Sequence, residues 1–306
     1  MIHFLLVEFF LMLKGELIKV LSSRIHKLKT INAYIKREDE LFYGSKIRKY
    51  LSLLPTLTNE KVILIGSLNS NNILIGSQLL IQNNKKPILF VKGNEKDLIG
   101  NSLLSCLFLK KSDINFIERK EWKNLDDILN QFLKKNSKES FDIIKEGASN
   151  LESIYGSMTL CDDILKNEIE NNIQFNSIFI DSGTGTTAIA LILKFSKLKR
   201  KNLKVFVIQM NNELNFEDEL LKMKRQLFID DDFELIPFEV LYPNKLKSFG
   251  STNKELFKYI KYFAENEGVL LDPVYNAKLL LKSTEIIENL IGNSLIIHSE
   301  IGRAHV

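Results

Sequence analysis

Short apolar runs, each about as long as one strand, recur along this chain and are rich in β-branched residues. They show little alternation of apolar and polar side chains, which is typical of strands buried on both faces of a sheet. Amphipathic stretches of helical length lie between them, and this succession predicts an α/β fold with a largely parallel sheet. The runs are "KVILIG" (61–66), "PILFVK" (87–92), "DINFIE" (113–118), "SIFIDS" (177–182), "LKVFVIQ" (203–209), "FELIPFEV" (233–240) and "SLIIHS" (294–299). The helical stretches are 73–82, 151–170, 186–196, 214–228, 252–266 and 276–290.

The chain has 306 residues, which is long for one compact core and ordinary for two lobes that share a cleft. Polar stretches near 54–60 and 135–150 are the expected crossings between the lobes. Ligands of such folds bind at the carboxyl ends of the strands, so the residues directly after each strand are the first candidates for a site.

Composition narrows the classes of partner. The net charge is +4, from 42 Lys and Arg against 38 Asp and Glu, and the cations are spread along the chain. This gives little support to a nucleic-acid partner, and a small anionic ligand fits equally well. Cys106 and Cys161 form neither a disulfide framework nor metal spacing, which predicts an intracellular chain. No metal site is expected, because no ligand-spaced pair occurs among the histidines, which are His3, His26, His298 and His305.

The N-terminal stretch "MIHFLLVEFFLML" is the one segment that resembles a membrane address. Glu8 interrupts it, it is too short to span a bilayer, and no small-residue cleavage site follows. We expect an amphipathic first helix and no membrane partner. A start codon assigned too early, with Met12 as the true first residue, explains the stretch equally well.

A loop rich in glycine and hydroxyl groups, "SGTGTT" (182–187), follows one predicted strand and precedes a helix. Glycines let backbone N–H groups approach an anion, hydroxyls donate hydrogen bonds, and a helix N-terminus adds positive potential. The pattern is neither a Walker A motif nor GxGxxG. It predicts a phosphate site, with a tight turn capped by threonines as the alternative.

Other strand ends carry weaker signals. The segment "SLNSNN" (67–72) either caps the next helix or lines a pocket suited to a carboxylate and a hydroxyl. Tyr275 follows the apparent strand end and proline turn of "LLDPVYNAK" (270–278), where core packing is the usual role of a tyrosine. Ser299 follows the last strand, and His298 before it fits a buried or capping histidine.

Lys46 lies in "GSKIRKY" (44–50), where three cations fall within four positions. If 46–54 is helical, Lys46 borders the apolar face, whereas Arg48 and Lys49 point elsewhere and are expected on a solvated face. A lysine at that border can enter a cleft and act as a nucleophilic amine, although a lone lysine is usually solvent-exposed. The apolar face is Ile47, Tyr50, Leu51 and Leu54.

Several of these segments occur together in one known family. "YIKREDELFYGSKIRKYLSLL" resembles the "KRDD…GNKxRKLE" segment of the 1-aminocyclopropane-1-carboxylate deaminase and D-cysteine desulfhydrase family, which belongs to the fold-type II pyridoxal-phosphate enzymes. "IGSLNSNN" is similar to the family's "GGxQSNH", "EGASNLESIYG" to "GGSNxLGxxGY", and "DSGTGTTAIA" to "TGSGGTxAG". "GVLLDPVYNAK" is similar to "GxxLDPVYTGK" and "IIHSEIG" to "IHTGG". The matches cover roughly residues 34 to 302 in the family's order, and their joint register is far more specific than any one motif.

The resemblance implies a two-domain, three-layer α/β fold with mostly parallel sheets. A large cofactor-binding domain would comprise residues 1–55 and 161–306, and a small domain residues 56–160. It also implies a cytoplasmic homodimer that binds pyridoxal 5'-phosphate and a small amino acid, with no nucleic-acid or membrane partner.

The resemblance also implies roles for individual residues. Lys46 would carry the cofactor as an aldimine and then act as a base, Ser70 would meet the substrate carboxylate, and Tyr275 would face the reacting carbons. The cofactor itself supplies the electron sink. The other implied cofactor contacts are Asn71, Ser182, Gly183, Thr184, Gly185, Thr186, Thr187, Asn276 and Ser299.

Four residues depart from the family pattern. Ser45 replaces an asparagine before the lysine, and Asn72 replaces histidine or glutamine. Asn276 stands where deaminases of the family have glutamate and desulfhydrases have threonine, and an amide does not hold a pyridine nitrogen charged. Glu300 replaces a glycine near the cofactor ring, where it either contacts that nitrogen or obstructs the site.

The resemblance at Lys46, Ser70, Asn71, Tyr275 and the loop 182–187 implies α-proton abstraction and elimination, with release of ammonia and a keto acid. A D-cysteine desulfhydrase-like activity is preferred over 1-aminocyclopropane-1-carboxylate deamination, because glutamate is missing after Tyr275. One alternative is a catalytically degenerate or repurposed cofactor-binding protein of the same fold. Another is an α/β protein that binds a different phosphorylated ligand.

Overall fold

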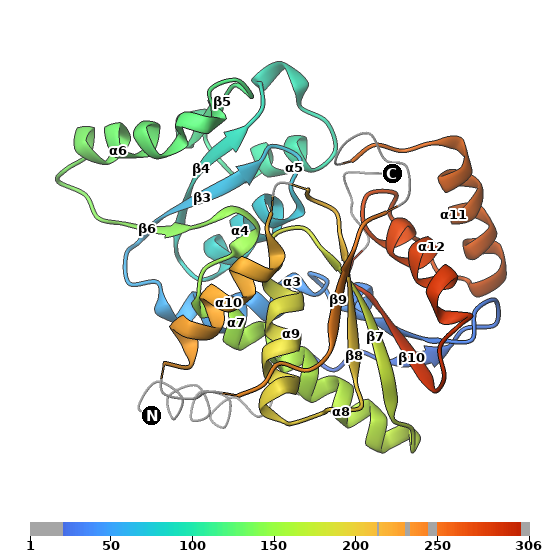
Figure 1. Cartoon of the computed structure of the whole chain (residues 1–306). Helices are drawn as coiled ribbons and strands as arrows, with labels where there is room; N and C mark the ends of the chain where they lie inside the picture. Colours follow the sequence, from blue (N-terminus) through green and yellow to red (C-terminus); the bar gives the residue numbers. More distant parts are fainter. Residues whose placement is uncertain (1–20, 213, 230–232, 244–249, 301–306) are drawn as a thin grey trace. The chain divides into compact units, whose positions relative to one another are not determined.

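The computed structural model describes residues 21–212, 214–229, 233–243 and 250–300, and these form two compact units (Figure 1). The larger unit contains the described residues up to Ser52 and from Leu151 onward, and the smaller unit is Leu53–Asn150. The predicted amphipathic helix at the N-terminus lies outside the described residues. Within the described ranges, no helix combines the length and the apolar character that crossing a bilayer requires.

The larger unit is built on a six-stranded sheet with the order β1-β2-β10-β7-β8-β9. Only the β1–β2 pair is antiparallel among the described strands, as expected for a sheet built from strand–helix–strand units. Its strands are β1 (Ile25–Lys27), β2 (Tyr34–Arg37), β7 (Phe175–Ser182), β8 (Lys204–Gln209), β9 (Phe238–Leu241) and β10 (Asn293–His298).

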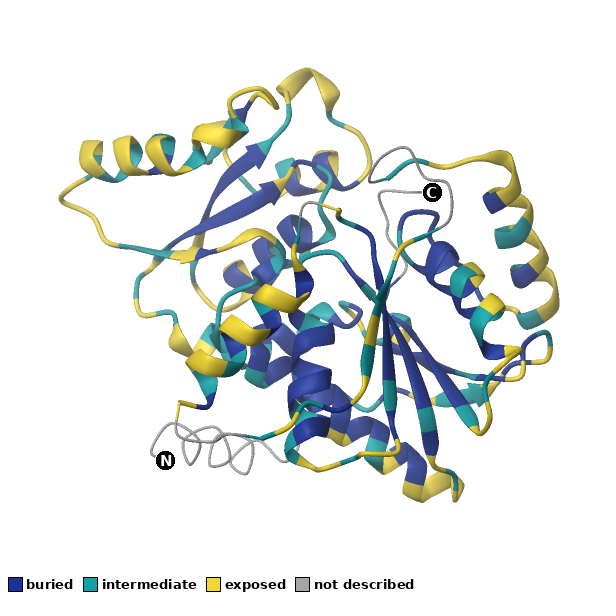
Figure 2. Ribbon diagram, in the orientation of Figure 1, coloured by how far each residue is buried: buried dark blue, intermediate teal, exposed yellow. Residues whose placement is uncertain are grey.

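Helices cover both faces of this sheet, which makes three layers (Figures 1 and 2). They are α3 (Lys46–Leu53), α7 (Glu152–Ser157), α8 (Thr159–Asn171), α9 (Thr186–Lys197), α10 (Phe216–Leu227), α11 (Lys254–Glu267) and α12 (Asn276–Ile287).

Alternate residues of each central strand enter two different cores. Ile178 and Ile180 of β7 pack into the core shared with α8, α9 and α10. Phe179 lies between them in sequence and packs into the opposite core, with α11, α12 and the stacked ring of Phe206. Because both faces are buried, the middle of each central strand needs apolar residues that face both ways, and this explains the apolar runs.

The smaller unit is a four-stranded parallel sheet with the order β5-β4-β3-β6. Its strands are β3 (Lys61–Ser67), β4 (Lys86–Lys92), β5 (Ile114–Ile117) and β6 (Phe141–Ile144). Its helices are α4 (Asn71–Gln82), α5 (Asn101–Leu107) and α6 (Leu125–Lys135).

The predicted α/β class with largely parallel sheets is confirmed. Some element assignments were wrong. The strand β9 (Phe238–Leu241) begins only near the end of the run 233–240, because proline has no N–H to donate to a ladder and the strand starts after Pro237. Residues 270–272 form no strand, and the stretch 151–170 is divided between α7 and α8 at Met158.

Candidate active site

Lys46 is the first residue of α3, and the loop before it is held against the end of β10. The Ser45 backbone N–H donates to the Ser299 carbonyl over 2.8 Å. Gly44 adopts φ +59°, and a Cβ at this position would lie 2.6 Å from the Glu300 Cβ. The glycine is therefore required twice, by its backbone conformation and by the close approach of the chain after β10.

Gly44→Ala should lower the free energy of unfolding by about 2–3 kcal/mol, because it adds a steric clash to the strain of a positive φ. Gly268→Ala is the matched control, since Gly268 has φ +66° and nothing within 4 Å of an added Cβ. Strain alone should cost the control about 1 kcal/mol. Urea unfolding of both variants measures the difference, and equal losses would contradict the close approach.

The Lys46 Nζ atom forms an ion pair with the Glu300 carboxylate. The side chains are 19% and 8% exposed, respectively. A pair so shielded from water interacts more strongly than a surface pair. Lys46 is therefore partly buried, and its role in the site stays a prediction.

Asn276 connects the end of β10 to the start of α12. Its amide Nδ2 donates to the Glu300 carbonyl over 2.6 Å and to Asp272 Oδ2 over 2.5 Å, while its Oδ1 accepts from the Ser299 N–H over 3.3 Å. The Asp272 carboxylate also accepts the backbone N–H groups of Val274, Tyr275 and Asn276, so it caps α12. The amide of Asn276 thus holds the chain that carries Glu300.

The loop 182–187 connects β7 to α9, and α9 begins at Thr186. Gly185 has φ +81°, and the Tyr275 ring lies 3.5 Å from the position that a Cβ on Gly183 would take. The Ser182 Oγ atom is buried and has no hydrogen-bond partner among the described residues. An unpaired buried hydroxyl, beside the N–H groups that begin a twelve-residue helix, suits a phosphate group.

Asp181 brings a further carboxylate to this region. Burial, together with the negative charge of Asp272, raises the pKa of Asp181 to about 6, although a hydrogen bond with Ser299 and the charge of Lys46 act in the opposite direction. Its Oδ1 atom is buried without a partner among the described residues. The sequence interpretation missed this residue because it lies inside a strand run.

Asp181→Asn should stabilise the cofactor-free protein at pH 8 by about 2–3 kcal/mol and have almost no effect at pH 4. The folded pKa of about 6 lies above the ordinary value of 3.8 for an aspartate. The folded state therefore binds the proton more tightly, and stability falls as the pH rises through this interval. The asparagine removes that loss. Urea unfolding at both pH values measures it, and an equal effect at both would contradict the raised pKa.

Arg48 and Lys49 do not lie on a solvated face, so that expectation was wrong. Both are buried. Burial, followed by the nearby charge of Lys46, lowers the pKa of Lys49 to about 7. Helical spacing identified only the apolar stripe of α3 and could not show that the rest of this helix is covered as well.

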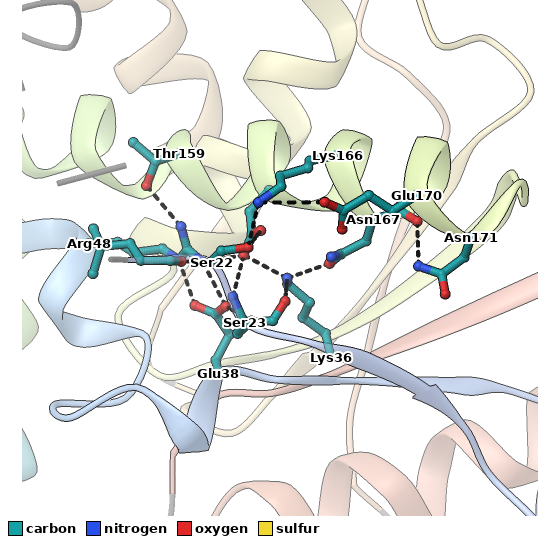
Figure 3. Close-up of polar contacts among 12 residues, drawn as sticks. Ser22, Ser23, Lys36, Glu38, Arg48, Thr159, Lys166, Asn167, Glu170 and Asn171 are labelled. Atoms are coloured by element: carbon teal, nitrogen blue, oxygen red, sulfur yellow. Dashed lines mark hydrogen bonds and ion pairs between the residues drawn. The ribbon is translucent and has the colours of Figure 1, made fainter. Parts of the chain in front are cut away.

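Arg48 is the centre of a buried ionic network (Figure 3). Its guanidinium donates to both Glu38 oxygens, over 2.6 and 2.8 Å, and to Asp163 Oδ2 over 2.7 Å. The Lys36 ammonium donates to Asp163 and Asn167 over 2.6 and 2.5 Å. The network connects α3, which carries Lys46, to β2 and α8 in the middle of the larger unit.

Ser70 and Asn71 belong to the smaller unit. Ser70 is the N-cap of α4, and its Oγ accepts the Asn72 N–H over 3.1 Å, which is the capping role anticipated for this segment. The side-chain Oδ1 of Asn71 accepts a hydrogen bond from the side-chain amide of Asn101. The larger unit contains the other candidates, which are Lys46, Tyr275, Asn276, Ser299 and the loop 182–187.

Comparison with known proteins identifies several relatives. A candidate 1-aminocyclopropane-1-carboxylate deaminase of Thermotoga maritima is 29% identical over 90% of this chain and 91% of its own length. The 1-aminocyclopropane-1-carboxylate deaminase of Cyberlindnera saturnus is 24% identical over 81% of this chain and 78% of its own. The bifunctional D-cysteine desulfhydrase/1-aminocyclopropane-1-carboxylate deaminase of Arabidopsis thaliana mitochondria is 25% identical over 80% and 65%, respectively.

The fold has counterparts among solved structures. An ACC deaminase homologue superposes with a TM-score of 0.76 at 22% identity, over 93% of this chain and 90% of that one. A threonine deaminase has a TM-score of 0.62 at 12% identity, over 91% of both chains. No family model matches the sequence. The relatives and the fold agree: over most of its length the chain resembles the 1-aminocyclopropane-1-carboxylate deaminase and D-cysteine desulfhydrase family, and its fold is that of the fold-type II pyridoxal-phosphate enzymes.

Proposed function

We propose that this protein is a pyridoxal-phosphate-dependent enzyme that releases ammonia and a keto acid from a small amino acid. The observation that carries the proposal is the half-buried Lys46 in the unit that also holds the loop 182–187 and Tyr275. The relatives named for deaminase and desulfhydrase activities support it. Those names give no support to the alternative of a catalytically degenerate protein.

The residues of the larger unit suit this cofactor. Ser182 Oγ and the first N–H groups of α9 would hold its phosphate. Lys49, whose pKa burial lowers to about 7, is a further buried amine that interacts with Asp181 of β7, and the sequence did not reveal it. Lys46 would attach to its aldehyde carbon. When bound, pyridoxal phosphate stabilises negative charge at the α-carbon of an amino acid.

The chain's own groups would then move protons and orient the substrate. The Lys46 amine, once released, would take the α-proton, as a base held on a helix can. Tyr275 lies beside Gly183 at the start of the phosphate loop, so we assign its hydroxyl to the substrate side of that loop. Ser70 would meet the substrate carboxylate and Asn71 the cofactor hydroxyl, as the family motif implies.

Asn276 favours a desulfhydrase-like reaction over ring-opening deamination. Its amide carries no charge and is hydrogen-bonded to Asp272 and the Glu300 carbonyl. It therefore does not offer the acid that deaminases of the family place after the tyrosine. Assays of D-cysteine, L-cysteine, D-serine and 1-aminocyclopropane-1-carboxylate for keto-acid release test this, and fastest turnover of the cyclopropane substrate would reverse the preference.

Cofactor attachment is tested by colour and by chemical trapping. Purified protein mixed with pyridoxal phosphate should turn yellow, and borohydride should fix the label on Lys46 and not on its buried neighbour Lys49. Mass spectrometry of the digested protein locates the label. A protein that stays colourless, or a label on another lysine, would contradict the proposed function.

A further inference from the structure

Three contacts hold the chain after β10, at Ser299 and Glu300, against its neighbours. Asn276 holds the Glu300 carbonyl, the Ser45 N–H holds the Ser299 carbonyl, and Gly44 packs against the Glu300 Cβ. Each contact fixes the main chain and leaves the carboxylate to extend toward the Lys46 Nζ. The main chain at Glu300 is therefore fixed, and its carboxylate belongs to the candidate site.

Glu300 is almost fully buried, so an unpaired charge on it would be costly. A carboxylate in contact with a nitrogen favours the form of that nitrogen that carries a proton, and the Glu300 carboxylate contacts the Lys46 nitrogen. The carboxylate therefore stabilises a protonated nitrogen at this position.

The other charged groups near Glu300 come from three elements. Lys49 of α3 is a second cation, and Asp181 of β7 is a second acid that also acts on Lys46. Asp272, before α12, acts on Asp181, but its own carboxylate is occupied by the N–H groups of the cap. Glu300 is the one acid among these that contacts the Lys46 nitrogen directly.

We propose that Glu300, which contacts the Lys46 nitrogen in the cofactor-free protein, keeps a proton on that nitrogen when the cofactor is attached to it. This inference rests on the proposed function. It assigns a positioning role to a residue where the family motif has glycine. The retained positive charge makes the linkage carbon more reactive toward an incoming amino group, because the nitrogen withdraws electrons more strongly.

Absorbance measures the proton directly, without any assay of activity. The linkage between pyridoxal phosphate and a lysine is yellow when its nitrogen is protonated, and its band moves to the ultraviolet when the proton leaves. In Glu300→Gln the pH at which half of the yellow band is lost should fall by roughly one to three units relative to the parent protein. Glu300→Asp, which keeps the charge, should restore part of that shift.

Two controls make the test specific. Glu40→Gln removes a carboxylate paired with the exposed Arg24 and should leave the midpoint unchanged. Asp181→Asn should shift the midpoint less than Glu300→Gln does. Among the described residues, Lys46 forms its ion pair with Glu300 and none with Asp181. Circular dichroism confirms that each variant is folded.

The outcomes separate this inference from the proposed function. If the parent protein turns yellow and Glu300→Gln has the same midpoint, the inference is wrong and the proposed function stands. If the parent stays colourless, both fall. Glu300→Gly is a second variant, and failure of both folded variants to take up the cofactor would also count against the inference, because each releases Lys46 from its ion pair.

Discussion

Arg48→Met should lower the free energy of unfolding by about 3–5 kcal/mol, the cost of leaving buried charges without their partner. Arg48 and Glu38 are among the most deeply buried charged side chains of the described residues. The substitution fills similar space but removes every donor to the Glu38 and Asp163 carboxylates that Arg48 supplies. Guanidinium unfolding, followed by circular dichroism, measures the loss.

The charge of Arg48 also affects its neighbours. Burial acts to raise the pKa of Asp163, but the charges of Lys36 and Arg48 outweigh it, and the net effect lowers that pKa. Without Arg48, only Lys36 remains as the positively charged partner of Asp163 among the described ion pairs. The loss of stability should therefore be smaller at low pH, where the carboxylates are neutral.

Arg24→Met is the matched control for Arg48. Arg24 pairs with Glu40 on the surface, and its side chain is 64% exposed. Exposed pairs contribute about 0–1 kcal/mol, so this substitution should have little effect. Similar losses in the two variants would show that the buried network does not stabilise the fold.

Lys46→Ala should reduce keto-acid release from the preferred amino acid by roughly 10³-fold or more, because it removes both the attachment point and the base. The loss should appear in kcat, since the groups proposed to bind the phosphate and the substrate remain. Single-turnover assays with a saturating concentration of pyridoxal phosphate measure the rate.

Lys46→Arg tests whether activity needs the primary amine of Lys46 or only its positive charge. A guanidinium can pair with Glu300, so the ion pair and the local fold are retained, but it does not attach to an aldehyde. We expect the same loss as for Lys46→Ala. Lys222→Ala on the exposed face of α10 is the control and should keep full activity. Activity of Lys46→Arg near the parent level would show that the positive charge suffices.

The regular parts of the fold were predictable from the sequence. A strand buried on both faces requires apolar residues throughout, so β3, β4, β7, β8 and β10 appear as uninterrupted runs. The segments β1, β2 and β6 are short and carry charged residues such as Lys36 and Arg37. Their pairing depends on neighbours distant in sequence, which periodicity does not reveal.

The candidate site, like the fold, was predictable only in part. Lys46 and the loop 182–187 have local sequence signatures. Lys46 follows a glycine and a serine at the start of a helix, and the loop follows a buried strand. Lys49 looked like a surface residue, because only the folded chain shows how deeply α3 is buried. Lys46 and Glu300 are far apart in sequence, and no local pattern predicts their contact. Which of these residues bind cofactor and substrate stays a prediction.

Asn276 and Glu300 both depart from the family pattern. The hydrogen bond from the Asn276 amide to the Glu300 carbonyl makes the two positions depend on each other. Asn276→Glu alone, intended to restore the acid of the deaminases, would remove the amide that holds Glu300 in place. It would also set a new carboxylate beside Asp272, where the amide now donates over 2.5 Å. Contacting residues do not contribute independently, so conversion toward the deaminase requires coordinated replacement of positions 276 and 300.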